Sequence, residues 1–162
     1  MLSHLQEINL EIDKRYASDD ELLHISQYVS SFSQRCIAYQ ELQKVEDALL
    51  QKVAQKLNLI DGGKLFQFGA KDVTDKWYQD TRRVLRHSAL AMLLNDPKLL
   101  QNRFLYWFQT IMQAFGTQRA CTLTYTVMEE TIDTFVSEPT ANLVKPILVL
   151  NRETLGEKQH KA

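Results

Sequence analysis

The chain has 162 residues, a formal net charge of −1 and a pI of about 6.4, with 44% apolar and 24% charged residues. A chain of this length and composition can bury roughly 70% of its unfolded surface in one core. The near-neutral charge creates no global field for nucleic acid, and no apolar run reaches the roughly 20 residues of a bilayer span. We therefore expect one domain over residues 1–162 that is cytoplasmic, with no membrane span and no nucleic-acid partner.

Helix breakers are sparse in this sequence, with three prolines and five glycines, and this spacing predicts an all-α fold. Ser18 should cap a helical stretch over about 20–59, which is either one rod or two helices bent near residues 30–33. Asp61-Gly62-Gly63 should end that stretch. A helix is also expected over about 2–15, because one face would carry Leu2, Leu5, Ile8 and Ile12.

The second half of the chain predicts a loop over 64–73 and then a helix from about 72–74 to 94. The buried stripe of that helix would be Val84, Leu85, Ala89, Met92 and Leu93. Asp96 and Pro97 should begin the next helix, which Gly116 should end. Its apolar residues are Leu100, Phe104, Leu105, Trp107, Phe108, Ile111 and Phe115.

The C-terminal part shows a weaker pattern. A helix is expected over about 118–136, followed by a last helix in "NLVKPILVL" that is interrupted at Pro146. Residues 152–162 are expected to form a disordered tail, and residues 1–17 a helical extension.

No catalytic motif is present: GxSxG, GxxxxGK[ST], HExxH and CxxC are all missing, so a catalytic site is not predicted. Cys36 and Cys121 lack metal-ligand spacing and are expected to be reduced, buried thiols, and no metal site is expected.

One stretch concentrates polar and aromatic groups within a few turns of a predicted helix. Its members are Trp77, Tyr78, Asp80, Arg82, Arg83, Arg86 and His87. Gln79, Arg82 or Arg83, and Arg86 fall on neighbouring helical rows and could present donors to a carboxylate or phosphate in one concave region. The alternative is a solvated basic face with i, i+4 pairs to Asp80. A haem-ligand role for His87 lacks a second histidine or an assignable distal pocket.

The stretch from Trp77 to Gly116 resembles the core of the phycobiliproteins, the light-harvesting subunits of phycobilisomes. The family's Asp matches Asp80, its Leu-Arg matches Leu85-Arg86, and its Ala-Gly-Asp turn matches residues 91–96. Upstream, "QYVSSFSQRCIAYQELQKVEDALLQKVAQKL" resembles the family's long helices, with Arg35 at a position where an Arg is usual. The resemblance covers about residues 18–137 and implies a globin-like, all-α fold with an N-terminal helical extension.

The departures from the family concern its chromophore. Trp77 stands at the position of the bilin-bearing Cys, so the resemblance implies no covalent bilin there. Gln79 stands where an Arg contacts the propionates, and the family's basic pair falls on Asp72 and Val73. Asp80, which in the family bonds the central pyrrole nitrogens, is kept. Trp77 either stacks on a ring or fills the space that a bilin would leave.

The resemblance implies a non-catalytic phycobilisome-associated protein, cytoplasmic or peripheral to the thylakoid membrane, that holds a bilin non-covalently. Bilin contacts would come from the seven residues of the 77–87 cluster. The first helix would pair the chain with itself or with a phycobiliprotein subunit. The alternative hypothesis is a sensor or handling protein for haem or free bilin, with His87 or Asp80 as the key contact.

Overall fold

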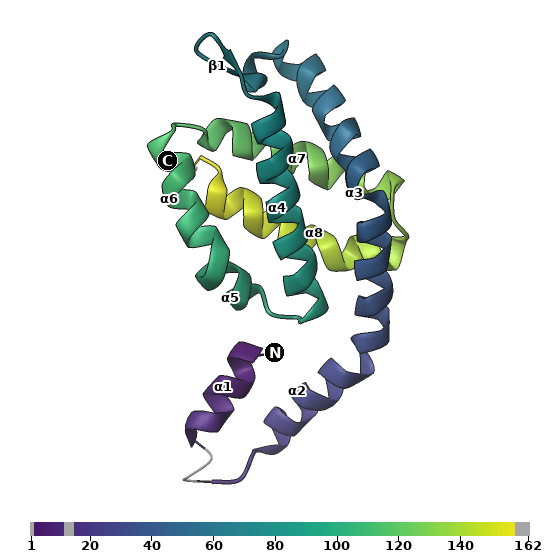
Figure 1. Ribbon diagram of the computed structural model, residues 1–162. Helices are drawn as coiled ribbons and strands as arrows, with labels where there is room; N and C mark the ends of the chain where they lie inside the picture. The colour runs from purple at the N-terminus through teal and green to yellow at the C-terminus, as the bar shows by residue number, and fades with distance from the viewer. Residues whose placement is uncertain (1, 12–14, 158–162) are drawn as a thin grey trace, which may run out of the picture.

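Helices dominate the computed structural model, which describes residues 2–11 and 15–157 (Figure 1). In chain order the helices and strands are α1 Leu2–Glu11, α2 Asp19–Ser30, α3 Phe32–Asp61, the 3₁₀ turn η1 Lys64–Phe66, β1 Gln67–Phe68, β2 Lys71–Asp72, α4 Thr74–Leu93, α5 Pro97–Leu100, the π-helical η2 Gln101–Leu105, α6 Tyr106–Ala114, α7 Gln118–Thr131, the 3₁₀ turn η3 Ile132–Thr134 and α8 Glu138–Leu155. The predicted all-α, globin-like fold is confirmed.

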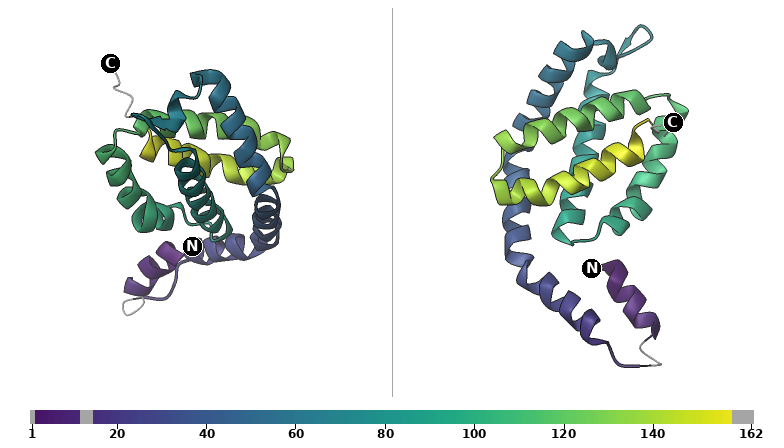
Figure 2. Two further views of the ribbon diagram at one scale, coloured as in Figure 1. Left: turned by 45° about the horizontal axis from the view of Figure 1, so that its top comes forward. Right: turned by 180° about the vertical axis from the view of Figure 1, so that it is seen from behind.

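The helices of the body cross in two layers. Helices α3 and α4 run side by side on one side of the molecule, and α7 and α8 cross behind them (Figures 1 and 2). The core between the layers is built from aliphatic side chains of all four helices, among them Leu49, Leu57, Val84, Met128 and Leu148. The predicted stripe on α4 is confirmed for Val84, Leu85, Ala89 and Met92, which are buried, whereas Leu93 is only half-buried.

Helices α1 and α2 form an N-terminal arm that extends away from this body (Figures 1 and 2). The structure selects two helices over one rod, because the chain turns at Ser31 between α2 and α3. Ser18 caps the start of α2, as predicted, and with Glu21 it forms a capping box. Helix α1 ends before Arg15, which is not helical, and residues 12–14 of the predicted first helix lie outside the described residues.

Arg35 holds the turn between α2 and α3 against the body. Its guanidinium donates to Tyr28 O at 2.9 Å, to Leu93 O at 2.8 Å and to Ser31 Oγ. It also lies over the Tyr28 ring, 4.2 Å from the centroid. Since Leu93 ends α4, this one buried side chain joins the ends of two helices that are far apart in sequence.

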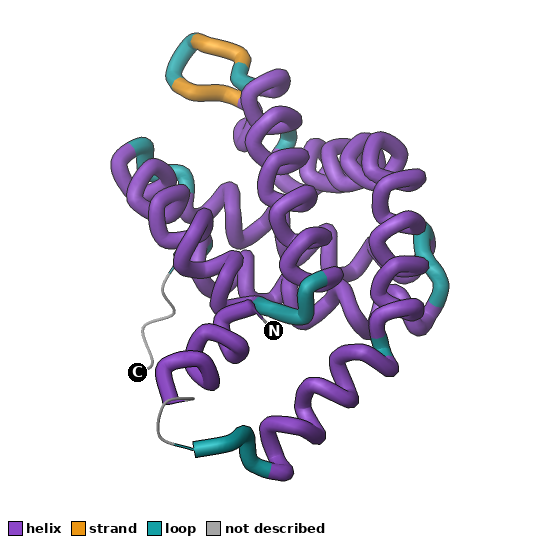
Figure 3. The backbone as a smooth tube through the Cα atoms, turned by 60° about the horizontal axis from the view of Figure 1, so that its bottom comes forward, coloured by secondary structure: helices purple, strands orange, loops and turns teal. Residues whose placement is uncertain are grey.

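The loop expected over 64–73 contains a small hairpin in which β1 pairs with β2, visible as the two strands in Figure 3. Gly69 in its turn has a φ of +61°, a conformation that favours glycine. Sequence periodicity misses strands of two residues because two positions cannot display an alternating pattern.

Two expectations for the C-terminal half are wrong. Pro146 does not interrupt α8, because it lies on an exposed face where water can bond the carbonyl that lost its partner. The chain does not fray from residue 152, because α8 continues to Leu155, which is fully buried; residues 158–162 lie outside the described part. The predicted helix 97–115 is confirmed, with π-helical hydrogen bonding over η2 between α5 and α6, and it carries Trp107 and Phe115 at 55% and 59% exposure.

Candidate functional site

The predicted site residues all lie on α4, but the structure distributes them over three faces of that helix. One face meets α3, one packs into the core beside α7, and one borders α6. The expectation that Gln79, Arg82 or Arg83, and Arg86 face one concave region is therefore wrong.

Arg82 and Arg86 face α3, where one carboxylate binds both of them. Glu46 accepts from Arg86 at 2.7 and 2.8 Å and from Arg82 Nε at 3.1 Å, while Asp47 accepts from Arg82 at 2.7 Å. The bidentate pair with Glu46 raises the pKa of Arg86. These two guanidiniums are thus paired with carboxylates of α3, whereas the solvated-face alternative expected i, i+4 pairs with Asp80 and its neighbours on the same helix.

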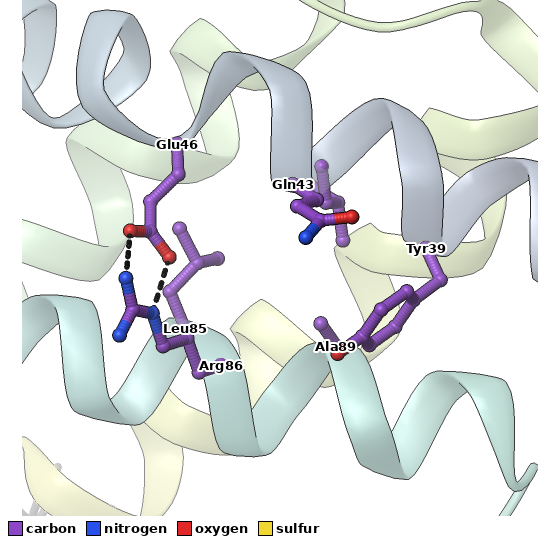
Figure 4. Close-up of a pocket in the computed structure, with 7 residues that line it drawn as sticks. Tyr39, Gln43, Glu46, Leu85, Arg86 and Ala89 are labelled. Atoms are coloured by element: carbon purple, nitrogen blue, oxygen red, sulfur yellow. Dashed lines mark hydrogen bonds and ion pairs between the residues drawn. The ribbon is translucent and has the colours of Figure 1, made fainter.

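The Glu46–Arg86 pair lies at one end of a cavity of about 200 Å³ between α3 and α4 (Figure 4). Tyr39 and Gln43 of α3 and Ala89 of α4 line its other end. The ion pair lines this end of the cavity. Because it joins a residue of α3 to arginines of α4, it stabilises the contact between the two helices.

Trp77 and Tyr78 pack inward beside the hairpin. The indole Nε1 donates to Thr124 Oγ1 on α7 at 3.0 Å, and the ring makes edge-to-face contacts with Phe66 at 5.4 Å and Tyr78 at 5.0 Å. These contacts hold Trp77, which is partly buried, against the core. A small apolar cavity of about 110 Å³ beside it is also lined by Asp80 and Cys121.

Arg83 and His87 lie toward the α6 side of the helix. The imidazole stacks on Phe104 of η2, with ring centroids 4.1 Å apart and planes at 15°. Burial of the ring, together with the charge of Arg83, lowers the pKa of His87. The Arg83 guanidinium is half-exposed and lies 4.0 Å from Asp80.

The largest hollow next to these residues is a groove of about 780 Å³, here called the α4–α6 groove. The hairpin and the residue after it contribute Phe68, Lys71, Asp72 and Val73; α4 contributes Asp75, Lys76, Gln79 and Asp80; and α6 with the segment after it contributes Ile111, Met112, Phe115 and Thr117. Small-molecule sites typically measure about 300–1,000 Å³, so this groove is large enough for a sizeable organic ligand. Of the seven predicted residues, only Asp80 lines it.

Asp80 connects the α4–α6 groove to the cavity beside Trp77, because it lines both. Lys76 donates to its Oδ1 at 2.6 Å, and the carboxylate is 15% exposed. No hydrogen bond from another described residue reaches its second oxygen. Burial, with a further contribution from the charge of Asp80, raises the pKa of Cys121 to about 12 and so keeps that thiol protonated at neutral pH. Cys36 is only half-buried, contrary to expectation.

Sequence reasoning missed Phe68, Lys71 and Asp75, because the hairpin that brings the first two to the groove was expected to be a loop. Phe115, one of the apolar residues of the predicted 97–115 helix, forms the end of the groove against Phe68, with ring centroids 6.3 Å apart. The available signal was the resemblance itself, which places chromophore-contacting positions on Asp72, Val73 and Gln79, and all three line the groove.

The fold and the groove define a globin-like helical protein with a ligand-sized groove between two helices. Comparison with protein families gives a match to the phycobilisome protein family over residues 9–153, nearly the whole chain, and the chain belongs to this family. Phycobiliproteins bind bilin chromophores, assemble with other subunits and are generally not enzymes. Comparison with curated proteins gave no match.

Neither a membrane-spanning helix nor a metal site is found among the residues that the structure describes. No helix in residues 2–11 and 15–157 is both long and apolar enough to cross a bilayer. The same residues contain no group of three or more His, Cys, Asp or Glu side chains that could hold a metal ion.

The lining of the α4–α6 groove suits the ring system of a bilin but is unfavourable for its carboxylates. Val73, Ile111 and Met112 supply apolar surface for the body of a tetrapyrrole, and the second oxygen of Asp80 can accept from pyrrole N–H groups. Asp72 and Asp75 also line the groove, however, and their negative charges disfavour a ligand that carries carboxylate arms.

Proposed function

We propose that this chain is a non-catalytic, phycobilisome-associated protein that holds a bilin without a covalent bond in the α4–α6 groove. The proposal rests on the presence of this ligand-sized groove. Trp77 does not fill the groove, because its indole packs against the core and donates to Thr124. When bound, the bilin supplies absorption of visible light. The protein's part is to exclude water from the ring system and to hold its N–H groups at Asp80.

Non-covalent binding is favoured by the chemistry of the residues around the groove. The resemblance puts Trp77 at the attachment position, and an indole cannot form the thioether. Cys121 is the nearest thiol among the residues lining the adjoining cavity, and with a pKa of about 12 it has almost no thiolate at neutral pH to add to a bilin. A bound bilin would therefore leave the protein when the protein unfolds.

The test of the groove is a titration of the purified full-length protein with phycocyanobilin, followed by absorption spectroscopy. Binding should shift and sharpen the long-wavelength band, and denaturing gel electrophoresis should then show a colourless protein. Gln79→Trp, at an exposed position in the groove, should abolish the spectral change. Gln43→Trp is the matched control, because Gln43 is also exposed but lines the cavity between α3 and α4.

The outcomes separate the competing hypotheses. A spectrum that stays that of free phycocyanobilin would refute the bilin part of the proposal. A response to haem but not to phycocyanobilin would favour the alternative haem sensor, although His87 is stacked on Phe104 and does not line the groove. A coloured band after denaturation would show that attachment is covalent.

The N-terminal arm is the part of the chain that we propose for subunit pairing, with itself or with a phycobiliprotein subunit. Helix α2 has no buried residue, and exposed apolar side chains continue along the arm into α3: Leu22 53%, Leu23 54%, Val29 64%, Phe32 45% and Ile37 53%. Such a surface is typical of a protein–protein contact. This association would place the protein at phycobilisomes, on the periphery of the thylakoid membrane.

Pairing through the arm is tested by the oligomeric state of the full-length protein in light scattering, alone and mixed with phycobiliprotein subunits. Leu22→Glu combined with Leu23→Glu should dissociate the assembly. Leu59→Glu is the control, because Leu59 is 87% exposed but lies at the other end of α3. An unchanged assembly in the double variant would contradict pairing through the arm.

A further inference from the structure

The charges around the α4–α6 groove are unbalanced. Its lining carries three carboxylates, Asp72, Asp75 and Asp80, against two lysines, Lys71 and Lys76. The net formal charge of the lining is therefore −1. A ligand with two carboxylates would bring two further negative charges into this environment.

The two lysines differ in their availability to a ligand. Lys76 is committed to Asp80, with Nζ 2.6 Å from Oδ1. Lys71, on β2 of the hairpin, is exposed, and among the described residues no carboxylate lies within ion-pairing distance of it. Lys71 is thus the one cation of the lining that can meet a carboxylate without first breaking an internal pair.

The carboxylates of the lining are also unequal. Asp72 accepts from the backbone N and the hydroxyl of Thr74 at 2.8 and 2.6 Å, so it stabilises the start of α4. Asp80 is paired with Lys76. Asp75 is exposed in the first turn of α4, and no described side chain pairs with it, so its charge acts directly on the groove.

We propose that the α4–α6 groove binds its ligand through a single carboxylate held by Lys71, and that Asp75 repels a second one. This inference rests on the proposed function, because it assumes that the groove holds a tetrapyrrole. It differs from binding by a pair of basic residues on the helix: the cation comes from the hairpin, and the second propionate of a bilin projects into solvent. Lys71 and Asp75 are therefore specificity-determining residues for the charge of the ligand.

The experiment compares phycocyanobilin with its dimethyl ester, which keeps the ring system and removes both negative charges. Lys71→Gln should weaken binding of the free acid about tenfold, since one charge-assisted contact is lost, and should leave affinity for the ester unchanged. Asp75→Asn should strengthen binding of the acid several-fold and leave the ester unchanged. Both side chains are exposed, so neither substitution should prevent folding.

Failure of this inference differs from failure of the proposed function. If wild-type protein binds neither phycocyanobilin nor its ester, both are refuted. If the wild type binds both compounds and Lys71→Gln alters the two affinities equally or not at all, the groove holds the ligand and the role of Lys71 is wrong. If Asp75→Asn does not raise affinity for the acid, Asp75 does not select against the second carboxylate.

Discussion

Replacing Trp77 tests whether this side chain stabilises the fold or contacts the ligand. Trp77→Ala removes a mostly buried ring. A Trp that buries roughly 200 Å² contributes several kcal/mol at about 25 cal/mol/Å², and partial exposure reduces this to about 3 kcal/mol. The lost hydrogen bond to Thr124 adds about 1 kcal/mol. We therefore expect the free energy of unfolding to fall by about 3 to 4 kcal/mol.

Two further variants separate the contribution of the Trp77 ring to the free energy of unfolding from that of its hydrogen bond, and compare it with a more exposed tryptophan. Trp77→Phe keeps an aromatic ring against Phe66 but loses the indole N–H and part of the indole ring system, so it should cost about 1–2 kcal/mol. Trp107→Ala removes the other tryptophan, which is 55% exposed, and on the same scale should cost about 2 kcal/mol. Urea unfolding followed by far-UV circular dichroism measures all three without depending on tryptophan fluorescence.

The structural role of Trp77 would be refuted if Trp77→Ala cost no more than Trp107→Ala. A small loss of stability combined with a large loss of phycocyanobilin affinity would show instead that the indole contacts the ligand. The expected pattern is the reverse, with a large loss of stability in Trp77→Ala and full ligand binding by the folded Trp77→Phe variant.

Three further predictions concern groups that hold the fold together. Arg35→Met removes three hydrogen bonds at a side chain that is 2% exposed, so it should destabilise the protein by about 3 kcal/mol and make the N-terminal arm more sensitive to limited proteolysis; unchanged cleavage would contradict the bridging role. Ser88→Ala leaves the buried amide of Asn151 without the acceptor that lies 2.8 Å away, and should cost about 1–3 kcal/mol; adding Asn151→Leu should recover part of this in urea unfolding. Burial alone would raise the pKa of Asp96, but hydrogen bonds from the backbone N–H groups of Ser3 and Leu99 outweigh it and lower the pKa, so its stabilisation is present above the unfolded value and is lost as pH falls through the folded one. The melting temperature should therefore fall more steeply from pH 5 to pH 3 in the wild type than in Asp96→Asn, and parallel curves would show that Asp96 is not responsible.

Much of the secondary structure could be predicted because its determinants are local. The N-cap at Ser18, the Asp96-Pro97 junction and the helix end at Gly116 each depend on a few neighbouring residues, and all three are as expected. Pro146 shows the limit of local rules, since the packing of Ile147 and Leu148 into the core keeps α8 continuous through a residue that would end an isolated helix.

The site was predictable only in part. The order of residues along one helix is read from the sequence, but which of them face a common groove depends on the packing of other helices. The order of residues along α4 was sufficient to indicate the family and to single out Asp80, which lines the α4–α6 groove. Which face of α4 each side chain occupies depends on its neighbours: Glu46 on α3 pairs with Arg82 and Arg86, and Thr124 on α7 holds Trp77.

The sequence by itself determined an all-α chain, its main helix boundaries and its membership of a bilin-binding family, since these follow from residue periodicity, helix caps and the order of residues in one segment. Only the tertiary structure decided that the predicted cluster divides over three faces and that the groove lies between α4, α6 and the hairpin. The physical reason is that a groove is formed by the packing of segments distant in the chain. Lys71 can bind a ligand only because the fold brings it to the same groove as Asp75, Asp80 and apolar side chains of α6.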